Sequence, residues 1–103
     1  SIDSDRSVIA VHAQNFNSRA VCSDIACLDP RSLSPVDVLF ISPPCQQWSV
    51  ARSKHLPARA DAEMGEIFCR YIQVLAPKFV FLENVRGYAQ SKALQQIENT
   101  LYG

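Results

Sequence analysis

Two runs of apolar residues, each about as long as a β-strand, restrict the folds open to this chain most strongly. VDVLFIS covers residues 36–42, and KFVFLEN covers residues 78–84. Apolar runs without strict alternation are typical of strands buried on both faces of a parallel sheet. A helix is expected between them, from Asp61 to Ala76 and ended by Pro77. A single crossover helix predicts that the two strands are parallel.

The remaining residues continue this alternation of strands and helices. We expect a strand ending at Asp3, a helix capped by Asp3 or Ser4 and running to about Phe16, and a short strand ending at Asp24. A last helix is expected over Gln90–Leu101. The order predicts an α/β fold in one small domain, with an open, mostly parallel sheet. The predicted inward positions are Val8, Ala10, Val11 and Phe16 in the first helix, and Met64, Ile67, Phe68, Tyr71, Ile72 and Leu75 in the second.

Charge and cysteine content say less about partners. Ten Lys and Arg residues balance ten Asp and Glu residues, so a nucleic-acid partner would have to bind a local basic patch. No apolar run is long enough to span a bilayer, so we expect no membrane partner. The cysteines have no C-x-x-C spacing and form no zinc pattern with either histidine, which predicts free thiols and no metal site. They are Cys22, Cys27, Cys45 and Cys69, and the histidines are His12 and His55.

The ends of the two apolar runs carry the candidate chemistry. Cys45 lies just past the first run, and Glu83 lies at the end of the second. Parallel neighbouring strands, about 4.8 Å apart, would bring this thiol and this carboxyl to one pocket at the ligand-binding edge. Pro43 and Pro44 stiffen the support of the thiol. A nucleophilic cysteine with an acid suits attack on an unsaturated ring. The alternatives are a small buried cysteine and a helix-capping or solvated glutamate.

Two segments carry a family resemblance. SPPCQQWS (42–49) and FVFLENVRGY (79–88) resemble the PPCQxxS and ENV motifs of the cytosine-5 DNA methyltransferases, in the same order and with an SDI segment before them. The resemblance implies a partial Rossmann-like, S-adenosylmethionine-dependent methyltransferase fold. It also implies that residues 1–103 are the central part of a catalytic domain. The family's glycine-rich loop, target-recognition region and C-terminal motifs are not in this sequence.

The sequence starts at Ser1, and its one methionine is Met64, so we expect a processed chain or a piece of a longer protein. We expect such a piece to bind cofactor poorly and to be inactive alone.

The resemblance also implies roles for individual residues. Cys45 would add to carbon 6 of a cytosine that has been flipped out of DNA, and Glu83 would hydrogen-bond to ring N3. Asn84 would hold the cysteine loop in place. The loop from Gln46 to about Arg59 would close over the nucleotide, with Trp48 packing its base or touching the flipped base. Ser49 and Arg52 would contact a phosphate of the target DNA strand.

The implied cofactor is S-adenosylmethionine. Asp24 resembles the acid that accepts a hydrogen bond from the adenine amine, and Ile2 and Ile25 resemble the apolar residues beside the adenine ring. Pro44 would line the same pocket, with Met64 close to it. The alternative for Asp24 is an ordinary turn aspartate.

Three functions stay open from the sequence. The first is a DNA methyltransferase segment of the restriction-modification or phage type, in the bacterial cytoplasm or with the nucleoid. The second keeps the chemistry but acts on transfer RNA. The third is a non-catalytic, truncated homologue that packs against a partner chain. Missing segments or a partner chain would complete the domain.

Overall fold

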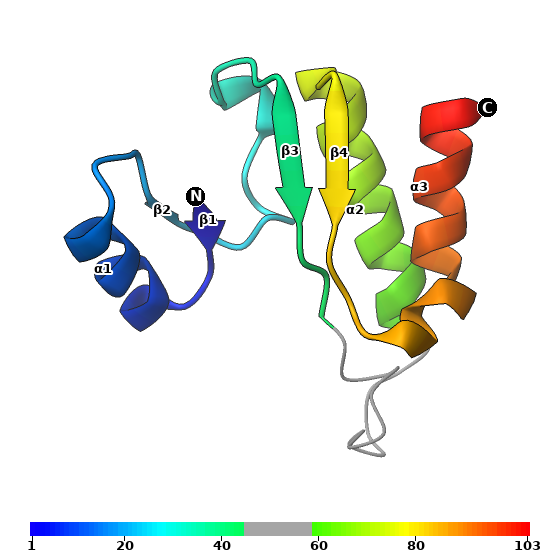
Figure 1. The fold of residues 1–103 in the computed structure, drawn as a ribbon, viewed down its shortest axis with the longest axis horizontal. Coiled ribbons are helices and arrows are strands. Elements are labelled where there is room, and N and C mark those ends of the chain that lie inside the picture. The colour runs from blue at the N-terminus through cyan, green and yellow to red at the C-terminus, as the bar shows by residue number, and fades with distance from the viewer. Residues whose placement is uncertain (45–58) are drawn as a thin grey trace. The chain divides into compact units, whose positions relative to one another are not determined.

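The computed structural model describes residues 1–44 and 59–103, with side chains from residue 61 in the second range. Contacts divide the chain into two units, Ser1–Leu33 and Ser34–Gly103. Both units combine helices with parallel strands, which confirms the predicted α/β class (Figure 1). The described strands form two separate parallel pairs, where one open sheet was expected.

The first unit is built on one short strand pair. Strand β1 (Ile2–Asp3) runs parallel to β2 (Val21–Cys22), and helix α1 (Arg6–Asn15) connects them. The helix is capped by Asp5, whose carboxylate accepts hydrogen bonds from the backbone N–H groups of Ser7 at 2.8 Å and Val8 at 3.3 Å. The expected cap at Asp3 or Ser4 is therefore wrong, because Asp3 Oδ1 instead accepts from the N–H of Asp5. The Ser7 hydroxyl and these N–H groups lower the pKa of Asp5.

The apolar face expected for α1 is not buried. None of the ten residues of α1 is buried in the described part of the chain, and Phe16, which follows the helix, is 61% exposed. The ring of Phe16 lies against that of His12, with centroids 4.8 Å apart. Two strands of two residues offer too little apolar surface to cover a helix.

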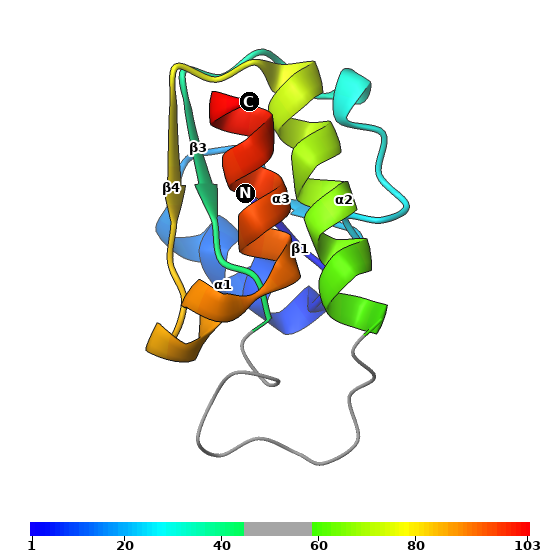
Figure 2. The ribbon, with the colours of Figure 1, turned by 90° about the vertical axis from the view of Figure 1, so that its right-hand side faces the viewer.

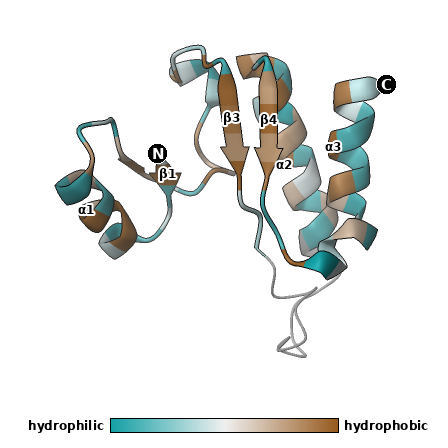
Figure 3. Ribbon diagram, in the orientation of Figure 1, coloured by the Kyte–Doolittle hydropathy of each residue, from teal (hydrophilic) through white to brown (hydrophobic). Residues whose placement is uncertain are grey.

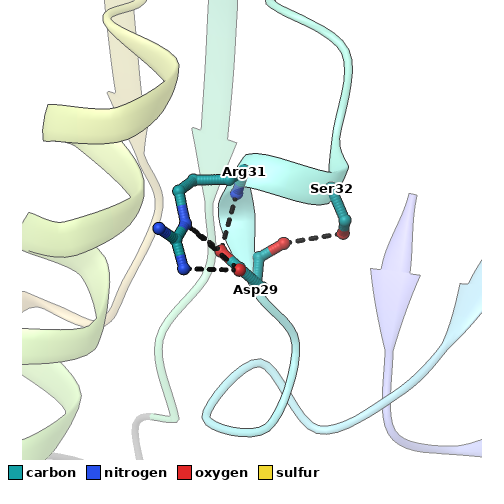
Figure 4. A network of polar contacts seen from close by, with 3 residues as sticks. All are labelled: Asp29, Arg31 and Ser32. Carbon is teal, nitrogen blue, oxygen red and sulfur yellow. Dashed lines mark hydrogen bonds and ion pairs between the residues drawn. The ribbon is translucent and has the colours of Figure 1, made fainter.

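A short turn closes this unit. The 3₁₀ helix η1 (Pro30–Ser32) is capped by Asp29, whose carboxylate accepts from the backbone N–H of Arg31 at 2.9 Å. The Arg31 guanidinium also pairs with this carboxylate at 3.0 Å, and the Ser32 hydroxyl donates to the Asp29 carbonyl (Figure 4). This network is exposed, so it shapes the turn and adds little stability.

The second unit has a sheet layer and a helix layer. Strands β3 (Val38–Ile41) and β4 (Phe79–Leu82) pair in parallel, with Val38 opposite Phe79 and Ile41 opposite Leu82. Helices α2 (Arg59–Leu75) and α3 (Lys92–Tyr102) lie on the same face of this pair (Figure 2). The predicted neighbouring parallel strands are thus confirmed. The apolar residues buried in this unit are Ile41, Phe68, Tyr71, Ile72, Leu75, Tyr88, Ala93 and Ile97.

The other face of the β3–β4 pair is apolar and exposed. Both strands are hydrophobic along their length (Figure 3). Alternation directs one set of side chains to the helices and leaves Phe40 75% and Phe81 52% exposed. These two rings stack on each other with centroids 5.0 Å apart. Burial on both faces, expected from the apolar runs, is therefore not found in the described residues.

Helix α2 closely matches its prediction. Phe68, Tyr71, Ile72 and Leu75 are buried as expected, while Met64 and Ile67 are half-buried. The helix ends at Leu75, and Ala76 takes a positive φ of 44° before Pro77. No helix within the described residues is both long and apolar enough to cross a membrane.

The last helix starts two residues later than expected. A 3₁₀ helix, η2 (Arg86–Gln90), comes first, and α3 begins only at Lys92. The break falls at Ser91, whose hydroxyl oxygen accepts a hydrogen bond from the backbone N–H of Leu94 at 3.0 Å. A serine cap satisfies one of the free N–H groups of a new helix, which explains the restart.

Candidate active site

The described parts of the two motif segments lie side by side at one edge of the β3–β4 pair. Ile41 is opposite Leu82, and the backbone N–H of Glu83 donates to the Ile41 carbonyl at 3.0 Å. The parallel ladder therefore continues one residue beyond β4. Since both strands end here, Ser42 to Pro44 and Glu83 to Asn84 leave the sheet from the same edge. This is the edge at which parallel α/β sheets bind ligands.

Asn84 joins the two segments directly. Its carboxamide Nδ2 donates to the carbonyl oxygen of Pro43 at 2.8 Å, and its Oδ1 accepts from the backbone N–H of Val85 at 2.8 Å. The first bond links residues 41 positions apart. Pro43 is buried, while Pro44 is exposed. The Asn84 side chain thus holds the residues that lead to the cysteine and also fixes the backbone at Val85.

Glu83 presents its carboxyl at the surface of this edge. Its main chain is tied to β3, while its side chain is exposed. Among the described residues it caps neither following helix. Val85 precedes η2 without a side-chain cap, and Ser91 caps α3. The structure therefore argues against the helix-capping alternative, while the exposure of Glu83 agrees with the solvated alternative.

Four of the predicted site residues fall outside the described ranges. They are Cys45, Gln46, Ser49 and Arg52. The meeting of the Cys45 thiol with the Glu83 carboxyl stays a prediction, supported by the positions of their flanking residues. Trp48 and His55 also fall outside these ranges.

Most of the predicted cofactor residues belong to the first unit. Asp24 is exposed, directly after the β1–β2 ladder, which extends through a bond from the Ser23 N–H to the Asp3 carbonyl at 3.0 Å. Its Oδ1 accepts from the N–H of Ala26 at 2.9 Å, so Asp24 does shape a turn. The apolar Ile2 and Ile25 are both half-buried. Pro44 lies in the second unit, so each part of the predicted pocket is described separately.

The described cysteines fit the prediction of free thiols. Cys22 and Cys27 are exposed, Cys69 is half-buried, and all three are free. Cys22 Sγ donates a weak bond to the Ser4 carbonyl at 3.7 Å. Within residues 1–44 and 59–103, no group of three His, Cys, Asp or Glu side chains could hold a metal ion.

A buried polar cluster near this edge was missed from sequence. Asp61 is 8% exposed, and its Oδ2 accepts from the backbone N–H of Lys92 at 2.8 Å. Tyr88 is 2% exposed, and its buried hydroxyl lies near Ser91. Burial raises the pKa of Tyr88, the interaction with the Ser91 side chain opposes part of the rise, and the nearby Asp61 carboxylate adds to it. A carboxylate at a helix start is a visible signal, but its partner 31 positions away is not.

Comparison with known proteins identifies the family to which the chain belongs. The family model for C-5 cytosine-specific DNA methylase matches residues 1–102. The chain is 26% identical over 100 residues to the Type II methyltransferase M.FnuDI of Fusobacterium nucleatum, covering 94% of this chain and 28% of that protein. It is 32% identical over 82 residues to the Type II methyltransferase M.DdeI of Desulfomicrobium norvegicum, covering 76% and 20%. It is 33% identical over 85 residues to the orphan methyltransferase M.SPRI of Bacillus phage SPR, covering 80% and 18%.

The chain therefore spans between 18% and 28% of the length of these relatives. The family match extends across both units and includes residues 42–49 and 79–88, which hold the two motif segments. On this basis the chain belongs to the C-5 cytosine-specific DNA methylase family.

Proposed function

We propose that this chain is the central part of a catalytic domain that transfers a methyl group from S-adenosylmethionine to carbon 5 of cytosine in DNA. The observation that carries the proposal is the parallel pairing of β3 and β4, tightened by the bond from Asn84 to Pro43. It brings the segment leading to Cys45 next to Glu83. DNA is favoured over transfer RNA because the matching family is described as a DNA methylase.

The two site residues divide the chemistry between them. The Cys45 sulfur forms a bond to carbon 6 of cytosine, and the electron pair of the ring's 5,6 double bond moves toward carbon 5. Glu83 hydrogen-bonds to N3 and the exocyclic amine, which stabilises the negative charge that enters the ring. After methylation, loss of the proton on carbon 5 and departure of the Cys45 thiolate restore the double bond. The exposure of Glu83 supports this role, because a base that has left the duplex could reach an exposed carboxyl.

The residues of the first unit fit the proposed cofactor. S-adenosylmethionine supplies an electrophilic methyl group bonded to a sulfonium sulfur. A carboxylate has two oxygens and about four acceptor sites, so the bond from Ala26 to Asp24 Oδ1 leaves capacity for the adenine amine. Ile2 and Ile25 offer half-buried apolar surface for the ring. Pro44 is exposed at the end of its own segment, and we propose it as a further cofactor-binding residue.

The residues that follow Pro44 would hold the DNA. We propose that the loop starting at Gln46 closes over the flipped nucleotide, and that Ser49 and Arg52 contact its phosphate. Arg86 and Lys92, both exposed, begin η2 and α3 after the Glu83 segment. They offer positive charge there in a chain with no net charge.

A trapping experiment tests this function. DNA containing 5-fluorocytosine lacks the carbon 5 proton, so the adduct with Cys45 cannot resolve and survives on a denaturing gel. We expect the full-length protein that carries this chain to form a covalent complex that requires S-adenosylmethionine. Cys45→Ser should abolish the complex, and the control Cys22→Ser should retain it.

The other outcomes are equally informative. A complex that survives Cys45→Ser would remove Cys45 from its role. Trapping on 5-fluorocytosine transfer RNA alone would move the substrate to RNA. If the protein carrying this chain forms neither complex, the catalytic proposal fails and the non-catalytic packing role takes its place.

A further inference from the structure

One carboxylate joins the starts of two helices. Asp61 lies in the first turn of α2, and its Oδ2 accepts a 2.8 Å hydrogen bond from the backbone N–H of Lys92, the first residue of α3. A charged acceptor makes a stronger bond than a neutral one, and this one is 8% exposed. Negative charge also favours the positive ends of both helix dipoles.

This bond has a counterpart on the other side of residues 45–58. Those residues connect Pro44 to Arg59, so their two flanks are Pro43–Pro44 and the first turn of α2. Asn84 binds the first flank through the Pro43 carbonyl, and the Lys92 N–H binds the second through Asp61. The starts of α2 and α3 and the ends of β3 and β4 lie at the same end of the second unit (Figures 1 and 2). One continuous stretch, residues 84–92, therefore holds both flanks.

We propose that Asp61 is a positioning residue for the segment that carries the nucleophile. Its carboxylate fixes the point at which that segment enters α2. It does so by binding Lys92, which ends the stretch of residues 84–92 that begins beside Glu83. The significance of the role rests on the proposed function, because Cys45 lies in the segment. Asp61 acts through Lys92 and the start of α3, and it is not proposed to touch the base or the cofactor.

Lys92 offers a clean way to remove the donor. It is the first residue of α3, where proline is favoured because its missing N–H has no partner within the helix. Ser91 has φ −73° and ψ 148°, the extended conformation that proline requires of the residue before it. Lys92→Pro thus deletes the N–H, while Lys92→Ala deletes the side chain and keeps the N–H. Asp61→Asn keeps an acceptor oxygen without the charge, and Asp61→Ala removes both.

The readout is trypsin cleavage at Arg52 and Lys54 in the native protein, with the sites identified by mass. We expect Asp61→Ala and Lys92→Pro each to raise the cleavage rate about tenfold, because each variant loses one charge-assisted hydrogen bond. The double variant should be no faster than either single variant. Asp61→Asn should recover part of the loss. The controls Lys92→Ala and Glu66→Gln, an exposed charge on α2, should stay within about twofold of the parent.

A stability control separates positioning from general weakening. Ile97→Val in the buried face of α3 is expected to lower global stability by an amount similar to that of Asp61→Ala. If it raises cleavage at Arg52 as much, or if the effects of Asp61→Ala and Lys92→Pro add, the proposal is wrong. If Lys92→Pro does not fold, hydrogen exchange of the Lys92 amide in Asp61→Ala replaces it as the test. Loss of protection at this amide would support the proposal, and unchanged protection would contradict it. None of these readouts uses methylation, so they stand or fail independently of the trapping experiment.

Discussion

The carboxamide of Asn84 donates a 2.8 Å hydrogen bond to the carbonyl oxygen of Pro43 and thereby ties the end of β4 to the end of β3. A proline carbonyl cannot be paired by a neighbouring ladder once its strand has ended, and Pro43 is buried, so a side chain supplies the partner. The same carboxamide accepts from the Val85 N–H. Donor and acceptor are both needed, which explains an amide at this position.

Replacing Asn84 should separate these two requirements. Asn84→Asp keeps the acceptor for Val85 and places a carboxylate against the Pro43 carbonyl, while Asn84→Ala loses both bonds. We expect Asn84→Ala to destabilise the fold by about 1–3 kcal/mol, and Asn84→Asp by at least as much at neutral pH. Urea denaturation followed by circular dichroism measures both. An Asn84→Asp variant as stable as the parent would show that the bond to Pro43 contributes nothing.

Glu83→Gln should affect turnover far more than cofactor affinity. The exposed side chain contributes little to folding, so stability should change by less than about 0.5 kcal/mol. Loss of the acid should lower kcat by about a hundredfold or more. Steady-state kinetics of the full-length protein that carries this chain, with S-adenosylmethionine varied, give both parameters, with Glu98→Gln on the exposed face of α3 as the control. Equal losses in kcat and cofactor affinity would instead indicate a structural carboxylate.

Gly65→Ala should destabilise the second unit although alanine is the better helix former. A Cβ at this buried position in α2 would lie 2.7 Å from the Cα of Ala93 in α3 and would collide with the side chain of Gln96. Backbone cannot move aside as a side chain can, so the helices must separate. We expect a loss of about 1–3 kcal/mol in urea denaturation. Glu66→Ala, at the next and exposed position, should change stability by less than about 0.5 kcal/mol.

The buried hydroxyl of Tyr88 should make stability fall in alkali. Burial raises its pKa above the ordinary value of 10.0, so above about pH 10 the unfolded chain releases a proton that the folded chain retains. The stability it contributes is complete below that pH and is lost as the pH rises through the folded pKa. Denaturation midpoints measured from neutral to strongly alkaline pH should fall less steeply for Tyr88→Phe. At neutral pH that variant should differ from the parent by less than about 1 kcal/mol, because the hydroxyl interacts only with the Ser91 side chain among the groups that lower its pKa.

Local patterns were enough to locate most elements of the second unit. The apolar runs predicted β3 and β4, and helical spacing identified the face of α2 that buries Phe68, Tyr71, Ile72 and Leu75. Proline position predicted the end of that helix within one residue. The motif segments also pointed to Glu83 and Asn84, whose roles in the site stay proposals. Periodicity and backbone chemistry act over a few residues, so a sequence expresses them directly.

The pairing across long distances was decided by the tertiary structure. Nothing local indicates that Asp61 accepts from a backbone N–H 31 positions away, because backbone groups are the same at nearly every residue. The resemblance implied that Asn84 holds the cysteine loop, but not that its partner is the Pro43 carbonyl. The last helix restarts at Lys92, where the Ser91 cap and the bond from the Lys92 N–H to Asp61 both act. The apolar pattern also could not predict that one face of β3 and β4 is exposed. Such a pattern indicates that side chains avoid water, but it does not indicate which segment covers them.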